Sequence, residues 1–82
     1  MKQQNPIIRN AAARAAIAEL NQVERHKLAR ILEAIGADAE DTAQRAWRQR
    51  KGPMANYWLA TGVNARHIAR ALRLVPTQEA LI

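Results

Sequence analysis

The sequence has no cysteine and no phenylalanine, and its three aromatic side chains are Trp47, Tyr57 and Trp58. The absence of cysteine excludes disulfide bonds and thiolate metal sites and suits a reducing compartment. Long hydrophobic runs are also missing, so no stretch of the sequence reaches the length of a membrane span. Arg14 and Glu19 interrupt the apolar start of the chain, which is therefore unlike a secretory signal. We expect a cytoplasmic protein that does not enter a membrane.

The apolar content is dominated by small side chains. Hydrophobic residues make up 49% of the 82 residues, but much of that fraction is alanine. A core built from the remaining isoleucine, leucine and valine side chains is thin for a chain of this size. We therefore expect one domain over residues 1–82, with residues 1–4 disordered, and association into a homodimer as a further way to bury apolar surface.

Acidic side chains are unevenly distributed. Residues 1–41 hold six basic and six acidic side chains, whereas residues 42–78 hold seven basic side chains and no acidic one. The formal net charge of +6 therefore resides in the second half of the chain. A region of one sign favours a polyanionic partner, such as nucleic acid, an anionic membrane surface or an acidic protein face.

Capping signals and apolar periodicity predict an all-α bundle of four to five short helices. The first is expected over about residues 6–20, after an N-cap at Asn5 that is followed by proline. The second begins after Asn21, where Glu24 completes a capping-box pattern, and ends at Gly36.

Three further helices are expected in the rest of the chain. Asp38 caps the third helix and Gly52 ends it. The fourth is expected over residues 53–61 and the fifth over residues 65–75, with a left-handed turn at Gly62 between them.

The predicted core gathers large apolar side chains from the second, third and fifth helices: Leu28, Ile31, Leu32, Ile35, Trp47, Ile68 and Leu72. In the second helix these side chains follow the i, i+3, i+4, i+7 spacing of one buried stripe. Off this stripe we expect an ordinary solvated face made of Arg25, His26, Lys27 and Arg30.

A glycine, an apolar residue and a polar cap separate the last two expected helices, and an apolar residue lies near the middle of the second of them. These places are held by Gly62, Val63, Asn64 and Ile68. The arrangement over residues 53–75 resembles the helix-turn-helix of small bacterial, phage and plasmid regulators. The chain departs from that family at Trp58, where a small residue usually precedes the turn glycine by four positions.

The resemblance implies that the helix over residues 65–75 enters the DNA major groove and reads base edges with its N-terminal half. Arg66, His67 and Arg70 would then face the bases. Asn64 and Arg73 would lie nearer the phosphates.

A second group of basic residues at the end of the third helix is expected to hold backbone phosphate: Arg45, Arg48, Arg50 and Lys51. Together the two groups predict a small DNA-binding transcriptional regulator of a bacterium or a mobile element. Two alternatives use the same basic face. One is a helical adaptor or inhibitor, such as a phage- or plasmid-encoded anti-defence protein, that docks on an acidic protein surface. The other is an RNA-binding protein.

The sequence carries no catalytic or cofactor signature. His26 and His67 lie on different expected helices without the spacing of metal ligands. The carboxylates of Asp38, Glu40 and Asp41 are explained by the start of a helix. We therefore expect a protein that is not an enzyme and needs no cofactor or metal.

Overall fold

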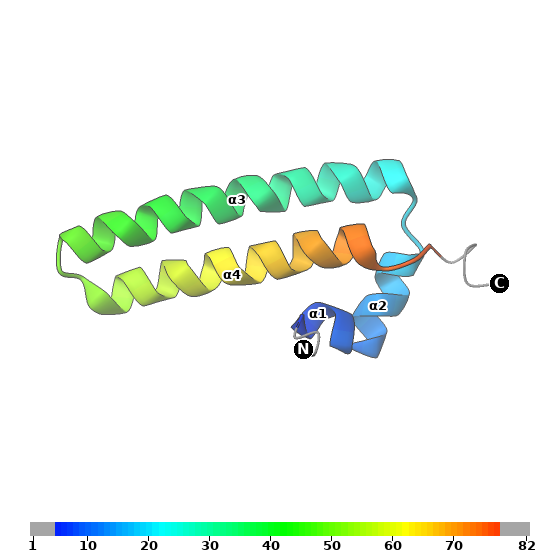
Figure 1. Cartoon of the computed structure of the whole chain (residues 1–82), viewed down its shortest axis with the longest axis horizontal. Coiled ribbons are helices and arrows are strands. Elements are labelled where there is room, and N and C mark those ends of the chain that lie inside the picture. The colour runs from blue at the N-terminus through cyan, green and yellow to red at the C-terminus, as the bar shows by residue number, and fades with distance from the viewer. Residues whose placement is uncertain (1–4, 78–82) are drawn as a thin grey trace.

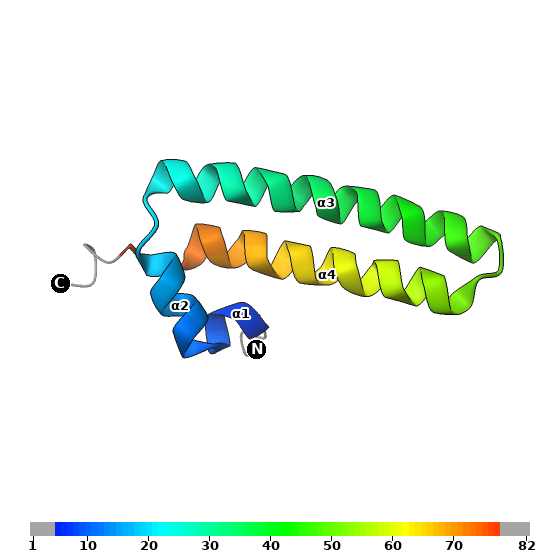
Figure 2. The ribbon, with the colours of Figure 1, turned by 180° about the vertical axis from the view of Figure 1, so that it is seen from behind.

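The computed structural model describes residues 5–77, so the expectation for residues 1–4 lies outside the described residues. Its helices are α1 (Pro6–Arg9), α2 (Ala11–Ala18), α3 (Gln22–Arg48) and α4 (Gly52–Leu74). The described residues include no strand, which confirms the all-α class. α3 and α4 run antiparallel as one long hairpin, and α1 and α2 pack against the C-terminal half of α4 (Figures 1 and 2). The extents of 52 × 27 × 21 Å describe an elongated molecule.

Small side chains line the seam between α3 and α4. The buried seam residues of α3 include Ala29, Gly36, Ala39, Ala43 and Ala46. Those of α4 include Ala55, Gly62, Ala65, Ala69 and Leu72. With the half-buried Leu32 and Trp58, these positions recur alternately three and four residues apart. That is the heptad spacing of helices that wind around each other.

At Gly36 and Gly62 the two helix backbones approach closely. A Cβ atom on Gly62 would lie 3.3 Å from the carbonyl oxygen of Gly36 and 3.5 Å from the Cβ atom of Ala39. Both glycines have helical geometry, so the helix ends expected at them are wrong. Asp38 and Asn64 accordingly lie inside helices instead of capping them. The expected helix-turn-helix pair is one uninterrupted helix, because close packing outweighs the roughly 1 kcal/mol helix cost of glycine.

The core prediction is wrong for four of its residues. Exposed fractions of 40, 56, 46 and 54% are found for Leu28, Ile31, Ile35 and Trp47. Leu72 is buried, and Leu32 and Ile68 pack partly against the core. Leu28, Ile31 and Ile35 form a stripe beside the seam rather than on it. Two adjacent stripes of one helix share the same period, so periodicity alone does not tell which one is buried.

Asn10 divides the expected first helix in two. It has extended backbone angles (φ −83°, ψ 114°), ends α1 and caps α2, and its Oδ1 accepts from the N–H of Ala13 at 2.9 Å. The N-cap at Asn5 is confirmed, since its Oδ1 accepts from the N–H of Ile7 at 2.9 Å. The buried Asn5 also donates from Nδ2 to the carbonyl of His67 at 2.9 Å, which joins α1 to α4.

Arg25 is buried, although the sequence places it on a solvated face. It donates to five backbone carbonyls, those of Ile17, Leu20, Leu72, Val75 and Pro76. These carbonyls lie at and just beyond the C-terminal ends of α2 and α4, where backbone oxygens have no partner within the helix. One guanidinium on α3 therefore joins two helix ends. His26, Lys27 and Arg30 are exposed, as expected.

The start of α3 agrees with the sequence in detail. Asn21 Oδ1 accepts from the N–H of Glu24 at 2.8 Å, and Glu24 Oε1 accepts from the N–H of Asn21 at 2.9 Å. This reciprocal pair confirms the predicted capping box. Within residues 5–77, neither long helix has a stretch of sufficient length and hydropathy to cross a membrane.

Candidate functional site: a basic hairpin tip

The turn between α3 and α4 spans residues 49–51. The N–H of Lys51 donates to the carbonyl of Ala46 at 2.8 Å, and the N–H of Arg50 donates to the carbonyl of Trp47 at 2.9 Å. These two bonds define a Schellman motif, whose C′ residue has a left-handed conformation. That residue is Arg50, with φ 60°, and it is the one non-glycine residue of positive φ among those described.

Glycine is the residue that usually occupies such a position. Gly52, expected to end the third helix, comes two residues later and is the first residue of α4. The left-handed conformation costs a residue with a side chain about 1–2 kcal/mol. Residues held in strained backbone conformations cluster at functional sites. Arg50 therefore marks the turn as a candidate site.

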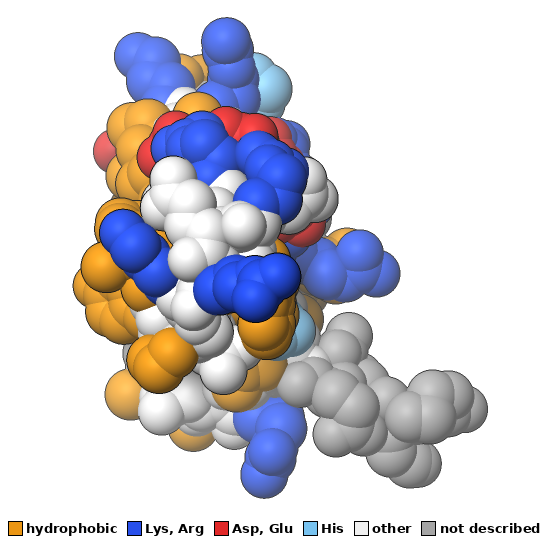
Figure 3. All heavy atoms as spheres, turned by 90° about the vertical axis from the view of Figure 1, so that its left-hand side faces the viewer, with side chains coloured by type: hydrophobic (Ala, Val, Ile, Leu, Met, Phe, Trp, Pro, Cys, Tyr) orange, Lys and Arg blue, Asp and Glu red, His pale blue; other side chains and the backbone are white. Residues whose placement is uncertain are grey.

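Basic side chains surround this turn. Arg48, Arg50 and Lys51 are exposed and form no hydrogen bond or ion pair through their side chains in the part of the chain that the structure describes. Arg45, one turn earlier, is paired with Asp41 and donates to Thr42 Oγ1 at 3.3 Å. Viewed end-on, this end of the hairpin shows basic and hydrophobic side chains side by side (Figure 3).

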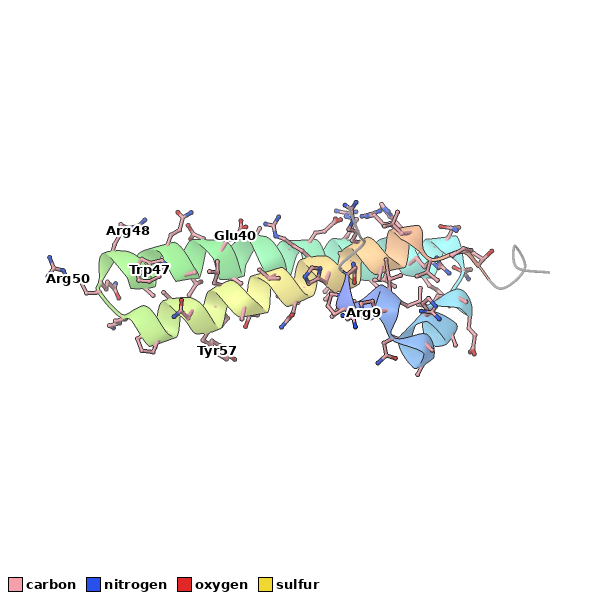
Figure 4. The ribbon with its side chains drawn as sticks, turned by 60° about the horizontal axis from the view of Figure 1, so that its bottom comes forward. Arg9, Glu40, Trp47, Arg48, Arg50 and Tyr57 are labelled. Atoms are coloured by element: carbon pink, nitrogen blue, oxygen red, sulfur yellow. The ribbon has the colours of Figure 1, made fainter. Side chains whose placement is uncertain are left out.

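Large apolar side chains are exposed around the same end. Trp47, Met54, Tyr57 and Leu59 are 54, 52, 62 and 45% exposed. Figure 4 shows Trp47 on α3 and Tyr57 pointing outward from α4. The Tyr57 ring meets the half-buried Trp58 edge-on, with 5.1 Å between the ring centres. We call residues 45–59 the hairpin tip.

The arginines of the predicted reading helix lie elsewhere, and two of them, one predicted to face bases and one to lie nearer the phosphates, are engaged within the fold. Arg66 donates to Glu40 Oε1 at 2.9 Å. Arg73 donates two hydrogen bonds of 3.1 Å, one to each carboxylate oxygen of Glu33. The hydrogen bonding from Arg73 is the main cause that lowers the pKa of Glu33 below its ordinary value of 4.5, against an opposing effect of desolvation.

The two ion pairs follow the seam repeat. They lie seven residues apart along each helix, and seven residues further toward the tip the corresponding positions are Trp47 and Leu59. The same edge of the hairpin therefore changes from paired charges to exposed apolar side chains as it reaches the tip.

The remaining predicted residues of α4 do not form one free face. Asn64 and Arg70 are exposed. His67 is half-buried, and its carbonyl accepts from the buried Asn5. The predicted site residues thus fall into two groups. The first group, at the tip, is Arg45, Arg48, Arg50 and Lys51. The second group lies within residues 64–73 of α4, a helix that packs against α3 and against α1 and α2.

Comparison with models of known protein families, with curated proteins and with solved structures finds no match to this chain. Among residues 5–77, no three His, Asp or Glu side chains are grouped so that they could hold a metal ion.

The sequence prediction missed two properties of the tip. The first is the left-handed Arg50, because the sequence predicts the end of the helix at Gly52, two residues later. The second is the exposure of Trp47, Met54 and Leu59. The alternating three- and four-residue spacing of alanine and glycine was the available signal, since it assigns the seam to small residues and leaves large ones outside.

Proposed function

We propose that this protein is a nucleic-acid-binding protein that holds backbone phosphates with its hairpin tip. The observation that carries the proposal is the group of three exposed, unpaired basic side chains at the turn, Arg48, Arg50 and Lys51. No acidic residue occurs between residues 42 and 77 to neutralise them. Lysine and arginine that neutralise phosphates release counterions, which favours binding at low salt.

Reading of base edges by α4 has less support. The side chains of Arg66 and Arg73 already bind carboxylates of α3. Exposed ion pairs contribute little to stability, but both would have to be broken and their glutamates left facing DNA. Contacts to phosphate carry little sequence information. We therefore propose binding of weak sequence preference.

The exposed aromatic side chains of the tip extend the proposal to single strands. Bases of single-stranded nucleic acid stack on exposed aromatic rings beside a basic groove, and each stack contributes about 1–3 kcal/mol. Trp47 and Tyr57 are the exposed rings. We expect single-stranded DNA to bind at least as tightly as duplex DNA of the same length.

The experiment compares two variants of equal charge. In the tip variant, Arg48, Arg50 and Lys51 become glutamine, and in the helix variant Arg66, Arg70 and Arg73 become glutamine. Binding of labelled duplex and single-stranded DNA is measured by fluorescence anisotropy between about 50 and 200 mM salt. The tip variant should lose most of the affinity for DNA, and the helix variant should lose less. In the tip variant, the slope of the logarithm of the binding constant against the logarithm of the salt concentration should be smaller by about two to three. Circular dichroism checks that both fold.

Two results contradict the proposal. The first is that the wild-type protein binds neither these DNAs nor a matched structured RNA at the lowest salt concentration. The second is a helix variant that loses more affinity than the tip variant, which would return the binding face to residues 64–73.

A second candidate function is docking on an acidic protein surface, and the exposed aliphatic side chains of the tip favour it. Met54 and Leu59 have no role in holding phosphate, whereas interface centres are enriched in Trp, Tyr, Met and Arg. Replacing Met54 and Leu59 by serine should leave DNA binding unchanged. The same replacement should abolish binding of a protein partner that co-purifies at fixed stoichiometry.

A further inference from the structure

The outer face of α3, opposite the seam, is exposed along its length and is not covered by α1, α2 or α4. We define this face by six residues spaced at one helical repeat: Lys27, Arg30, Ile31, Ala34, Asp38 and Asp41. A shallow hollow lies over its N-terminal half, lined by His26, Lys27, Arg30, Ile31 and Ala34.

Charges on this face are segregated into blocks. Lys27 and Arg30 form a basic block, and Asp38 and Asp41 form an acidic block further along the same helix. Like charges three or four residues apart destabilise an isolated helix. The side chain of Asp38 forms no hydrogen bond or ion pair in the described residues, and no basic side chain lies three or four residues from it in the sequence, whereas Asp41 is paired with Arg45 of the same helix.

The middle of the face is small and apolar. Ile31, Ala34 and Ala37 are exposed there, and Leu28 and Ile35 stand along one margin. Alanine at the centre permits two helices to approach closely, and the flanking isoleucine and leucine side chains supply apolar area to bury.

The charges on this face are complementary to those of a second copy of the face that runs in the opposite direction. Lys27 and Asp41 lie seven residues on either side of Ala34, and Arg30 and Asp38 lie four residues on either side of it. An antiparallel second copy with a twofold axis at Ala34 therefore sets the basic block of each chain against the acidic block of the other. A parallel copy would set like charges against each other, which is unfavourable.

We propose that the protein forms an antiparallel homodimer through the outer face of α3, with Ala34 on the twofold axis and reciprocal ion pairs between Lys27 and Asp41 and between Arg30 and Asp38. The interface is isologous, as in most homodimers. The proposal does not depend on the function of the hairpin tip.

Charge exchange tests the orientation. An acidic variant carries Lys27→Glu and Arg30→Glu, and a basic variant carries Asp38→Lys and Asp41→Lys. Each alone should be monomeric in sedimentation equilibrium, with self-association at least about tenfold weaker than wild type. An equal mixture of the two should form a heterodimer, because every interchain contact then joins opposite charges. Thermal unfolding of each variant verifies that the monomer remains folded.

Cross-linking tests the axis, since the chain has no native cysteine. An Ala34→Cys variant should form a disulfide-linked dimer rapidly on mild oxidation. The matched control is Ala60→Cys, at an exposed alanine of α4. The proposal is overturned if the wild type sediments as a monomer and the two cysteine variants cross-link equally slowly. It is also overturned if the single-sign variants dimerise as strongly as the wild type, or if their mixture gains no association.

Discussion

A methyl group on Gly62 would press against the backbone of Gly36, with its carbon 3.3 Å from the carbonyl oxygen. A methyl group on Gly36 would instead meet the side chain of Arg66 first, at 3.3 Å from Cγ, and the Gly62 carbonyl oxygen at 3.6 Å. A flexible side chain can move by a few tenths of an ångström more easily than a helix backbone. The two glycines of the seam are therefore not equivalent.

We predict unequal effects for alanine at these two positions. Gly36→Ala should raise the free energy of unfolding by up to about 1 kcal/mol, because alanine favours helix and Arg66 can shift. Gly62→Ala should gain less or lose stability, because two backbones must separate. Chemical denaturation of both variants measures the difference. Equal stabilisation by the two substitutions would show that the seam is looser than described.

Among the arginines, Arg25 should cost the most stability when it is replaced, because it is buried. Arg25→Met leaves buried carbonyls at the ends of α2 and α4 without donors, and we expect a loss of about 2–4 kcal/mol in the free energy of unfolding. Arg70→Met is the matched control, since Arg70 is exposed, and it should change stability by less than about 0.5 kcal/mol. A small effect of Arg25→Met would mean that water replaces the guanidinium.

Arg50→Gly should stabilise the protein and weaken its binding at the same time. Glycine relieves the left-handed strain, so we expect a gain of about 1 kcal/mol in the free energy of unfolding. Loss of one basic side chain should lower the salt slope of DNA binding by about one. Arg48→Gly, at the last residue of α3, separates the two effects because it should weaken binding without the gain in stability. Unaltered stability in Arg50→Gly would argue against the left-handed turn.

The ion pair between Arg73 and Glu33 predicts a pH dependence. The folded-state pKa of Glu33 is lowered, so its contribution to stability is present above the unfolded pKa and is lost as the pH falls through the folded pKa. A carbon-detected NMR titration should place the Glu33 midpoint below 4.5. Arg73→Gln should raise that midpoint, because it removes the hydrogen bond that is the main cause. An unchanged midpoint in this variant would contradict the pairing in solution.

Of the four helix caps that the sequence predicted, those at Asn5 and Asn21 are confirmed, and those at Asp38 and Asn64 are wrong because both residues lie inside helices. Asn5 and Asn21 cap helices as expected, because a short side chain and its own backbone settle the interaction within a few residues. The helix ends assigned to Gly36 and Gly62 failed for a different reason. Whether a glycine ends a helix or admits a second backbone depends on a partner helix far away in the sequence.

The candidate site was predicted in composition but not in arrangement. The four basic residues of the tip gather as their proximity in the sequence implies. The predicted reading face of α4 depended on a turn at Gly62, and its arginines lie opposite glutamates of α3 that no local pattern pairs with them. Arg25 could not be recognised either, because its partners include backbone oxygens at the end of α4 that lie 47 to 51 residues away in the sequence.

Positions on the alanine and glycine seam differ from outward positions of the same two helices in how many substitutions they tolerate. A substitution at the seam changes how near the backbones can lie, so few replacements are tolerated there. Outward positions such as Leu28, Val63 and Leu74 are exposed and contribute little to that contact. Such a hairpin can acquire a new surface, and with it a new partner, while its architecture is retained.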